Sequence, residues 1–573
     1  MDRAVKAKKR IKILFFFIVF MYVSILARAI YIDQFMGDNL RAKRINQSKR
    51  IVTLYARRGY ILDRNGSKLA LDVPYSSVYA IPSIITKNDE YAEKLSGILG
   101  EKKSEIISKL SKKDSNFVWL RRMISEDAGE KTRDLGLKGI GVAREAKRVY
   151  PNDSLAAGVV GFKGEDRGIE GVEYVLDNLL RGEDGMVLLE KDLKGRNIPN
   201  SIHERKPARN GSDVYLTIDI SIQHFAEQEL EKTIKKYSAR AGSIVVLDPK
   251  SGRVYAMATY PTFNPNNFSA YSKAPERYRN RVISSNFEPG SVMKPIVVAA
   301  AIDRGIIDPY KAAILCEPTI QIGSWTIGET HADGLPAYKT PMDVITHSYN
   351  TGAARIALKM KKELLRNTFE EFHFGSKYDI QLNGQESGIL RSLKEMNNSR
   401  VANNGYGHGI AVTQLQMAMA SAALINGGLL IQPGVVEKVI DPEGEVIYSF
   451  EPKVIKRVIS EETSKLMKHF MHMTVEEGTG KDAKIEGYSL GGKTGTARVP
   501  ARGGGYLREY ISSFVGFGPV EDPRLLAMVT IERPKGSYYG SVVAVPAFRE
   551  VMKKSLWHLD VPANDLPGSE VGY

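Results

Sequence analysis

Cysteine is almost absent from this chain of 573 residues, which contains only Cys316. A single thiol excludes an intramolecular disulfide framework and any zinc site built from several cysteines. Internal repeats and low-complexity tracts are absent as well. The remaining composition, with 43% hydrophobic and 26% charged residues, is that of an ordinary globular protein with room for more than one domain.

Acidic residues are fewer than basic ones. The chain has 66 Asp and Glu residues and 81 Lys and Arg residues, which gives a net charge of +15. Such an excess usually indicates an anionic partner or surface. No signature of a nucleic-acid module accompanies it. We therefore expect no nucleic-acid partner and interpret the charge as suited to an acidic membrane surface or polymer.

Long hydrophobic runs are rare, and the clearest one lies at the N-terminus. Residues 1–12 contain six Lys or Arg residues and one Asp, and residues 13–27 contain no charge. Continuing through Arg28, which can snorkel, to Ile32 gives the length of about 20 residues that a membrane span needs. Basic residues before the span predict a cytoplasmic N-terminus and an external body. A cleaved signal peptide is the alternative, because Ala27-Arg28-Ala29 resembles a cleavage site.

The part of the chain before residue 210 is rich in charge and loops. Short strand-like pieces occur at 51–56 and 76–82, and helical patterns occur at 90–100 and 102–111. This pattern predicts an elongated α+β region with little continuous core.

The part after residue 210 has stronger periodicity. A helical pattern covers 220–237, and two strand patterns flank the turn Pro249-Lys250-Ser251-Gly252. Another pair of strands is predicted at 512–519 and 524–534. Hairpins at both ends with helices between them predict one antiparallel sheet flanked by helices, so we assign the α+β class. We predict a basic segment and membrane anchor at 1–32, an elongated domain at 33–210, a sheet domain at 211–560 and a tail at 561–573.

The stretch EPGSVMKP places Ser291 three residues before Lys294, after the turn residues Pro289 and Gly290. The apolar run that follows predicts a buried helix beginning near Ser291. Residues three apart share a helix face, so the hydroxyl and the amine are expected to come into contact at a helix N-terminus. The alternative is a serine N-cap beside a solvated lysine, and this stretch alone does not decide between them.

Two later stretches contain related chemistry. Ser348 and Asn350 flank Tyr349 at the start of another predicted helix, where ordinary N-capping is the alternative. Residues 487–494, GYSLGGKT, match the phosphate-loop pattern letter for letter. That loop must open a helix, and the glycines and Pro500 that follow exclude one here.

We therefore expect Lys493-Thr494-Gly495-Thr496 on a strand. Alternation sends Lys493 and Gly495 to one face and the two threonines to the other. A glycine on such a strand lets a ligand lie against the backbone, and a hydroxyl beside a fixed cation suits a substrate carboxylate.

Ser-x-x-Lys, Ser-x-Asn and Lys-Thr-Gly in this order resemble the motifs of penicillin-recognising serine enzymes. Residues 58–66, RGYILDRNG, and 168–173, GIEGVE, are similar to two motifs of the class B penicillin-binding proteins, the second in their pedestal domain. The modest pedestal, here 33–210, and the ending YYGSVVAVPAFREVM look most like the division-specific, FtsI-like branch. One departure is Tyr349, where many relatives carry a second serine.

The resemblance implies roles for these residues. Ser291 would be the nucleophile, and Lys294 its base if burial and the charge of Lys493 keep it neutral. Ser348 would pass a proton to the leaving amine, and Asn350 would hold the donor peptide. The terminal carboxylate of that peptide would be bound by the strand, through Lys493, Thr494, Gly495 and Thr496.

The resemblance also implies an oxyanion site between the backbone N–H groups of Ser291 and Thr496. No metal or organic cofactor is expected, and His347 and His408 are interpreted as structural.

The implied function is that of a membrane-anchored peptidoglycan D,D-transpeptidase that acts in septal wall synthesis and is acylated by β-lactams. Expected partners are donor and acceptor wall peptides, the membrane, a glycosyltransferase of the SEDS type and divisome proteins. The expected location is the inner membrane, with a single pass and the catalytic domain outside the cytoplasm. Alternatives are an elongation-type transpeptidase, a D,D-carboxypeptidase or β-lactamase on the same scaffold, and a catalytically silent scaffold.

Overall fold

The computed structural model describes residues 2–36, 49–115, 117–190, 204–323, 325–330, 332–501 and 503–565. The chain forms two compact units. The first consists of Met1–Ala56 and Gly182–Asn210, and the second of Arg57–Arg181 and Gly211–Tyr573. The domain limits drawn from the sequence at residues 32, 210 and 560 stay a prediction.

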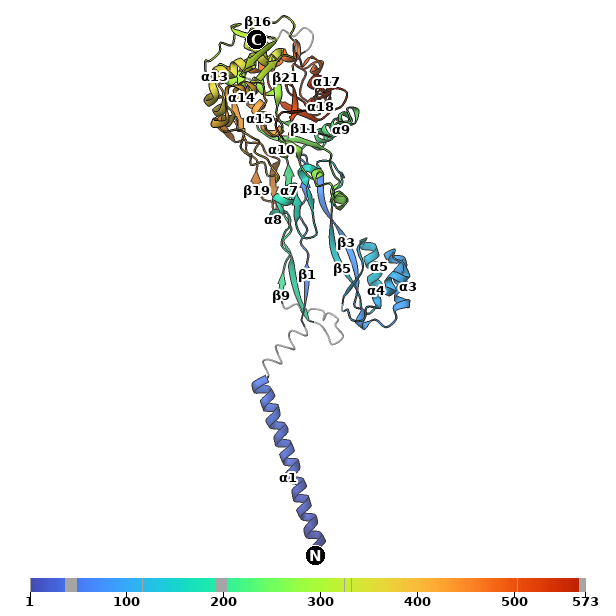
Figure 1. Cartoon of the computed structure of the whole chain (residues 1–573). Helices are drawn as coiled ribbons and strands as arrows, with labels where there is room; N and C mark the ends of the chain where they lie inside the picture. The colour runs from blue at the N-terminus through green and yellow to red at the C-terminus, as the bar shows by residue number, and fades with distance from the viewer. Residues whose placement is uncertain are drawn as a thin grey trace. The chain divides into compact units, whose positions relative to one another are not determined.

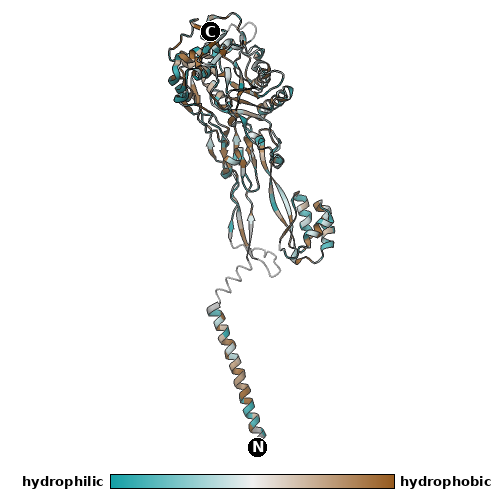
Figure 2. Cartoon of the chain, in the orientation of Figure 1, coloured by the Kyte–Doolittle hydropathy of each residue, from teal (hydrophilic) through white to brown (hydrophobic). Residues whose placement is uncertain are grey.

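The first unit contains a long N-terminal helix and a small sheet. Helix α1 spans Asp2–Tyr31 and continues into a π-helical turn, η1, at Ile32–Met36 (Figure 1). The segment Val5–Gln34 is long and apolar enough to cross a membrane, and Figure 2 shows its hydrophobic residues beyond a more hydrophilic N-terminal end. The sheet has the strand order β1-β8-β9, with bounds Lys49–Leu54, Gly185–Glu190 and Glu204–Lys206.

The second unit contains a seven-stranded sheet that combines strands from before and after residue 210. Its order is β19-β18-β10-β2-β3-β4, and β5 also pairs with β3. The bounds are β2 Ile61–Leu62, β3 Lys68–Ala80, β4 Val118–Ile124, β5 Ile140–Val149, β10 Asp213–Leu216, β18 Val436–Ile440 and β19 Val446–Ser449. Helices α3 (Asn88–Leu99), α4 (Lys103–Leu110) and α5 (Glu126–Asp134) pack near β3 and β4 around a separate small core.

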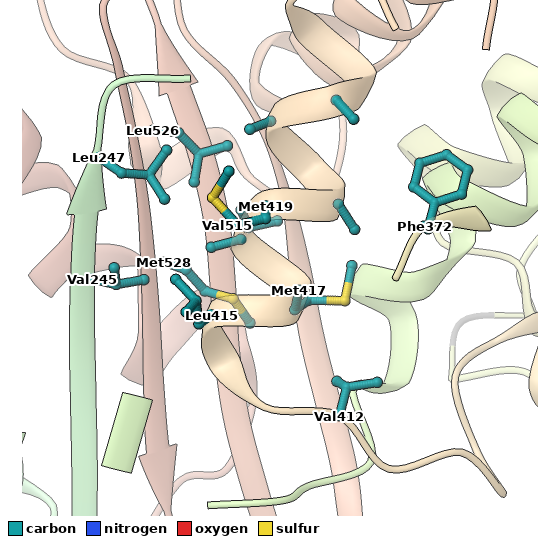
Figure 3. Close-up of a cluster of buried hydrophobic side chains, with 14 of the residues drawn as sticks. Val245, Leu247, Phe372, Val412, Leu415, Met417, Met419, Val515, Leu526 and Met528 are labelled. Atoms are coloured by element: carbon teal, nitrogen blue, oxygen red, sulfur yellow. The ribbon is translucent and has the colours of Figure 1, made fainter. Parts of the chain in front are cut away.

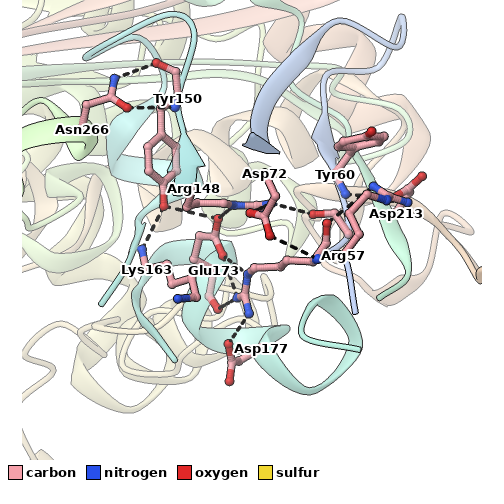
Figure 4. A network of polar contacts seen from close by, with 12 residues as sticks. Arg57, Tyr60, Asp72, Arg148, Tyr150, Lys163, Glu173, Asp177, Asp213 and Asn266 are labelled. Atoms are coloured by element: carbon pink, nitrogen blue, oxygen red, sulfur yellow. Dashed lines mark hydrogen bonds and ion pairs between the residues drawn. The ribbon is translucent and has the colours of Figure 1, made fainter. Parts of the chain in front are cut away.

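A buried ion network connects the two motifs found at 58–66 and 168–173. The Glu173 carboxylate accepts hydrogen bonds from Arg58 Nε at 2.8 Å and from Arg148 Nε at 2.6 Å (Figure 4). Arg148 also pairs with Asp72 at 3.3 Å, and Arg58 pairs with Asp177 at 2.7 Å. Removing one partner of such a network leaves a buried charge unpaired, at a cost of about 3–5 kcal/mol. The two motifs therefore hold this part of the second unit together.

A second sheet of the second unit is five-stranded and antiparallel, with the order β12-β11-β23-β22-β21. The bounds are β11 Ala241–Leu247, β12 Val254–Tyr260, β21 Gly491–Pro500, β22 Tyr506–Gly518 and β23 Leu525–Glu532. Helices α9 (Ile220–Lys236) and α18 (Val545–His558) share one core with one face of this sheet. The opposite face packs against α15 (Gln414–Ile425), and the hairpin strands predicted from the sequence are confirmed.

Helix α15 is mostly apolar and is buried along its whole length, as such a composition predicts. Leu415 and Met419 lie beside the sheet residues Val245, Val515 and Met528 (Figure 3).

The second unit also contains further α-helices and short strand pairs. The helices are α6 Ala157–Val160, α7 Gly171–Val175, α8 Asp177–Leu180, α10 Arg281–Ser284, α11 Lys294–Asp303, α12 Pro341–Thr346, α13 Asn350–Glu371, α14 Asn398–Gly405, α16 Glu461–Glu476 and α17 Gly540–Val543. The pairs are β6 Phe162–Lys163 with β7 Gly168–Glu170, β13 Ile314–Cys316 with β16 Ala337–Lys339, β14 Thr319–Ile322 with β15 Trp325–Gly328, and β17 Leu429–Ile431 with β20 Val454–Arg457.

Candidate active site

Ser291 lies at the start of the buried helix that the sequence predicted. A short 3-10 helix, η5, spans Gly290–Met293 and leads directly into α11. Neither helix has a side-chain cap, so Ser291 does not act as an N-cap. Lys294 is fully buried, which excludes the solvated lysine of the alternative interpretation.

The Lys294 amine is held by the second motif. Its Nζ donates to the Ser348 carbonyl, to Ser348 Oγ at 3.1 Å and to Asn350 Oδ1 at 2.8 Å. These acceptors use all three hydrogens of an ammonium group. In the part of the chain that the structure describes, no hydrogen bond joins Ser291 Oγ to Lys294 Nζ, and the contact expected from their spacing stays a prediction.

Ser348 adopts an unusual backbone conformation between α12 and α13. Its φ is +62°, in the left-handed region that a residue with a side chain rarely occupies. This conformation costs about 1–3 kcal/mol and persists where the surroundings fix it. Here both the carbonyl and the hydroxyl of Ser348 contact the Lys294 amine.

Tyr349, the one departure from the expected motif, belongs to the hydrophobic core. Its side chain is 7% exposed and stacks on His347 at 5.8 Å between ring centroids. His347, Ser348 and Asn350 line the cleft, while Tyr349 does not.

Glu329 was missed by the sequence analysis, although it contacts the start of α13. Its carboxylate accepts hydrogen bonds at 2.7 Å from the backbone N–H groups of Asn350 and Thr351 and from the Thr351 hydroxyl. A carboxylate at a helix N-terminus satisfies free N–H groups and complements the helix dipole. The Asn350 side chain is fixed further, because its Nδ2 donates to the Gly328 carbonyl at 2.9 Å. No sequence pattern marks Glu329.

The Lys-Thr-Gly motif lies on a strand, as predicted. Strand β21 forms one edge of the five-stranded sheet and, among the strands that the structure describes, pairs with β22 alone, with Lys493 opposite Val515 and Thr494 opposite Phe514. Lys493 is fully buried, and its Nζ lies 3.3 Å from Thr494 Oγ1. Thr494 and Thr496 line the cleft, which agrees with the alternation expected along the strand.

Close packing gives Gly495 a reason to be glycine beyond the substrate contact that the sequence predicts. A Cβ atom at this position would lie 2.3 Å from Ser513 Oγ and 3.1 Å from the Pro289 carbonyl oxygen. The backbone of Gly495 therefore lies close to β22 and to Pro289, the residue before η5. A side chain at position 495 would point to this side of the strand, opposite to the threonines that line the cleft. A direct contact of Gly495 with substrate stays a prediction.

Burial disfavours the charged form of both lysines and so lowers their pKa values. It lowers the pKa of Lys294 from 10.5 to about 7, against the opposing effect of the Glu329 charge. Burial also lowers the pKa of Lys493 well below its usual value, and the charge of Lys294 lowers it further. Burial, which was expected to keep Lys294 neutral together with the charge of Lys493, is the main cause for both residues, and the charge effect runs from Lys294 to Lys493.

The cleft has a volume of about 480 Å³ and brings together residues from all three motifs. Ser291, Ser348, Asn350, Thr494 and Thr496 line it, and the two lysines lie behind this surface. Among the described residues, no cluster of His, Cys, Asp and Glu side chains could hold a metal ion.

An aromatic wall forms much of the remaining lining, and the sequence analysis did not identify it. Its members are Trp325, Tyr406, Tyr506, Tyr510, Tyr538 and Tyr539. The rings of Tyr510 and Tyr538 stack 3.9 Å apart. Tyr506 and His408 both hydrogen-bond to the Glu288 carboxylate, at 3.0 Å and 2.9 Å.

A cleft serine in front of two buried lysines, beside the edge strand β21, defines a serine acyltransferase of the penicillin-recognising class. Two family models agree with this geometry. The penicillin-binding protein transpeptidase domain matches residues 242–553, and the penicillin-binding protein dimerisation domain matches residues 53–216. This chain belongs to the class B penicillin-binding proteins.

Individual relatives match over almost the whole chain. Stage V sporulation protein D of Bacillus subtilis is 32% identical over 97% of this chain and 87% of its own length. The peptidoglycan D,D-transpeptidase FtsI of Escherichia coli is 31% identical over 92% of this chain and 88% of its own. The crystal structure of penicillin-binding protein 2X from Streptococcus thermophilus covers 90% of this chain and 81% of that protein, with a TM-score of 0.75 and 27% identity. The family, the fold class and the transpeptidase class predicted from the sequence are confirmed.

Proposed function

We propose that this chain cross-links wall peptides through an acyl-enzyme on Ser291 and that it serves septal wall synthesis during division. The observation that supports the proposal is the position of Lys294, a buried amine with a pKa of about 7 that contacts Ser348 and Asn350 in the cleft. The resemblance to the FtsI-like branch supports the division role. An elongation-type role is the second candidate within the same family.

Acylation begins with attack of Ser291 Oγ on the carbonyl between the two terminal D-alanines of a wall peptide. Neutral Lys294 takes the serine proton, since an amine with a pKa near 7 is partly unprotonated at neutral pH. Contacts at a catalytic base often tighten only when substrate is bound. The Ser291 N–H belongs to the first turn of η5, where backbone N–H groups lack helical partners and suit an oxyanion. The Thr496 N–H is the second proposed oxyanion donor.

The leaving D-alanine amine needs a proton, and Ser348 provides the route. Its hydroxyl lies 3.1 Å from Lys294 Nζ, so a proton taken from Ser291 passes through Ser348 to the amine. Asn350 Nδ2 uses one hydrogen for Gly328 and keeps a second for the donor peptide. Thr494 and Thr496 bind the terminal carboxylate, with Lys493 behind them and Gly495 between them.

Deacylation completes the cross-link. The amine of a neighbouring wall strand attacks the ester, takes the acyl group and returns the proton to the Ser291 oxygen. A hydrolase on the same scaffold would use water at this step. The rate of loss of a bound β-lactam separates the two reactions, since slow loss indicates a transpeptidase and rapid loss a lactamase.

Helix α1 makes the chain a single-pass protein of the inner membrane, and peptidoglycan and β-lactams are the ligands of its family. Further proposals are an N-terminus in the cytoplasm, a pedestal at 33–210 and a transpeptidase domain at 211–560. We also propose contacts with a glycosyltransferase of the SEDS type and with divisome proteins. The basic residues before the span support the orientation.

The nucleophile is tested by Ser291→Ala with a fluorescent penicillin. We expect labelling to disappear while the circular dichroism spectrum is unchanged, and Ser272→Ala, an exposed serine, is the matched control. Labelling of Ser291→Ala at another residue would overturn the assignment. A fluorescent fusion tests the division role, since a midcell band supports it and patches along the side wall contradict it.

A further inference from the structure

A second cavity lies in the second unit, on the far side of the segment that precedes Ser291. Its volume is about 540 Å³, and it is formed where β11, β21, β22 and β23 end beside α10 and the start of α15. Two glutamates and five arginines line it, namely Arg240, Arg279, Arg281, Arg391 and Arg533. The mechanism proposed for the cleft uses none of these arginines.

The positive charge of this arginine pocket is only partly neutralised. Arg281 pairs with Glu532 at 3.1 Å, Arg533 with Glu509 at 3.0 Å and Arg391 with Glu395 at 3.1 Å. The exposed side chains of Arg240 and Arg279 have no ion-pair partner among the described residues. Two unpaired guanidinium groups beside one cavity favour an anion, which they can bind through planar pairs of N–H donors.

Polar atoms at the floor of the pocket also lack partners. Gln414 is 1% exposed and Thr530 is 4% exposed, and neither Gln414 Oε1 nor the Thr530 hydroxyl has a hydrogen bond within the described chain. The Gln414 amide is fixed, because its Nε2 donates to the carbonyls of Ser243 at 3.2 Å and Met528 at 2.7 Å. Arg281 Nε and Ser284 Oγ are likewise buried without partners. Buried polar groups are normally satisfied, so such a cluster around a cavity indicates a ligand.

The unsatisfied atoms define the chemistry of that ligand. The arginine N–H groups require acceptors and favour those with negative charge, the hydroxyls can donate or accept, and Gln414 Oε1 requires a donor. A peptide that carries carboxylates supplies both, since its amide N–H groups are donors. Inorganic phosphate or pyrophosphate supplies acceptors and few or no donors.

We propose that the arginine pocket is a second peptide-binding site, which takes a segment rich in carboxylates such as the acidic part of a wall stem peptide. The choice of a wall peptide rests on the proposed function, whereas the anionic peptide chemistry rests on the pocket itself. The pocket and the cleft share a wall, because Glu288 lines the pocket while its carboxylate binds His408 and Tyr506 in the cleft. A wall strand that occupies the pocket is thereby held next to the nucleophile.

The test uses the full-length protein in detergent, with Ser291 first acylated by penicillin so that the cleft is filled. N-acetyl-L-Ala-D-Glu, which has two carboxylates and two amide N–H groups, is titrated by isothermal calorimetry. Its uncharged diamide and inorganic pyrophosphate are the comparison ligands. The variant is Arg240→Gln with Arg279→Gln, and the matched control is Arg167→Gln with Arg524→Gln, which removes the same charge from exposed positions outside the pocket. Thermal melting checks the fold of both.

We expect one molecule of dipeptide to bind the acylated protein. Its affinity should fall about tenfold or more for the uncharged diamide and for the Arg240/Arg279 variant, and change less than about twofold for the control. No binding, binding that acylation abolishes, or an equal response of the two double variants would each overturn the proposal. If pyrophosphate binds more tightly than the dipeptide and its binding depends on Arg240 and Arg279, the site binds a phosphate compound and the peptide proposal is wrong. Penicillin labelling of Ser291 is measured separately from dipeptide binding. A loss of labelling would contradict the proposed function, whereas a loss of dipeptide binding would contradict this site alone.

Discussion

The buried position of Lys294 predicts how acylation depends on pH. With a pKa of about 7, the neutral amine makes up about one tenth of the protein at pH 6 and about nine tenths at pH 8. If neutral Lys294 is the base for Ser291, the second-order rate constant of acylation should rise about tenfold across this range and level off above it. Stopped-flow mixing with a fluorescent penicillin between pH 5 and 9 measures this rate constant.

Lys294→Arg removes the base while it keeps a long cationic side chain. Arginine stays protonated at these pH values, so acylation should slow by about 10²–10⁴ and lose its rise with pH. Circular dichroism is the control for folding. A variant that acylates at nearly the wild-type rate, or a wild-type profile that is flat between pH 6 and 8, would refute the role of Lys294 as base.

The same pKa predicts a change in stability with a definite sign. The pKa of Lys294 is 10.5 in the unfolded chain and about 7 in the folded one, so the unfolded chain binds more protons between these values. The free energy of unfolding therefore rises with pH in this window, by about 1.4 kcal/mol per pH unit from this group. Urea unfolding of wild type and of Lys294→Met at pH 7.5 and 9.5 isolates the contribution of Lys294 to this pH dependence. An equal pH dependence of the free energy of unfolding in both proteins would contradict the lowered pKa of Lys294.

Two further predictions concern Glu329 and the membrane helix. Glu329→Gln removes a negative charge that raises the pKa of Lys294, so the midpoint of the acylation profile should move below pH 7. Glu317→Gln is the control, and an unchanged or higher midpoint argues against this effect of the Glu329 charge on Lys294. Deletion of residues 1–36 should give a protein that is labelled by penicillin at the wild-type rate, because the cleft residues all belong to the second unit. The same deletion, exported in soluble form, should fail to support growth of a depletion strain, since it loses the high local concentration that tethering provides. Full rescue, or a folded protein without labelling, would contradict the separation of the two roles.

The sequence predicts the three motifs well because each one is local. Ser291 and Lys294 lie within one helical turn, and the alternation along Lys493–Thr496 fixes which side chains face the cleft. The hairpins of the five-stranded sheet were also predicted, since turn residues and apolar runs mark their ends.

Long-range contacts account for what the sequence does not predict. The Lys294 amine contacts Ser348 and Asn350, more than 50 residues away, and a spacing rule within one helix says nothing about such partners. Glu329 reaches the start of α13 from a strand pair with no motif of its own. The seven-stranded sheet draws β10, β18 and β19 from beyond residue 210, so a change in composition at that point does not reveal the pairing.

The aromatic wall has a consequence for the evolution of drug resistance. Tyr510 and Tyr538 are held by stacking on each other, and neither contacts the Lys294 amine, which is bound by Ser348 and Asn350 alone among the side chains described. If Lys294, Ser348 and Asn350 act as proposed, a mutation of one of them that rejects an inhibitor also damages the proposed transpeptidation. Changes in the stacked rings alter the shape of the cleft and leave the proton-transfer groups in place. On the proposed mechanism, selection by an antibiotic therefore acts most freely on the aromatic wall.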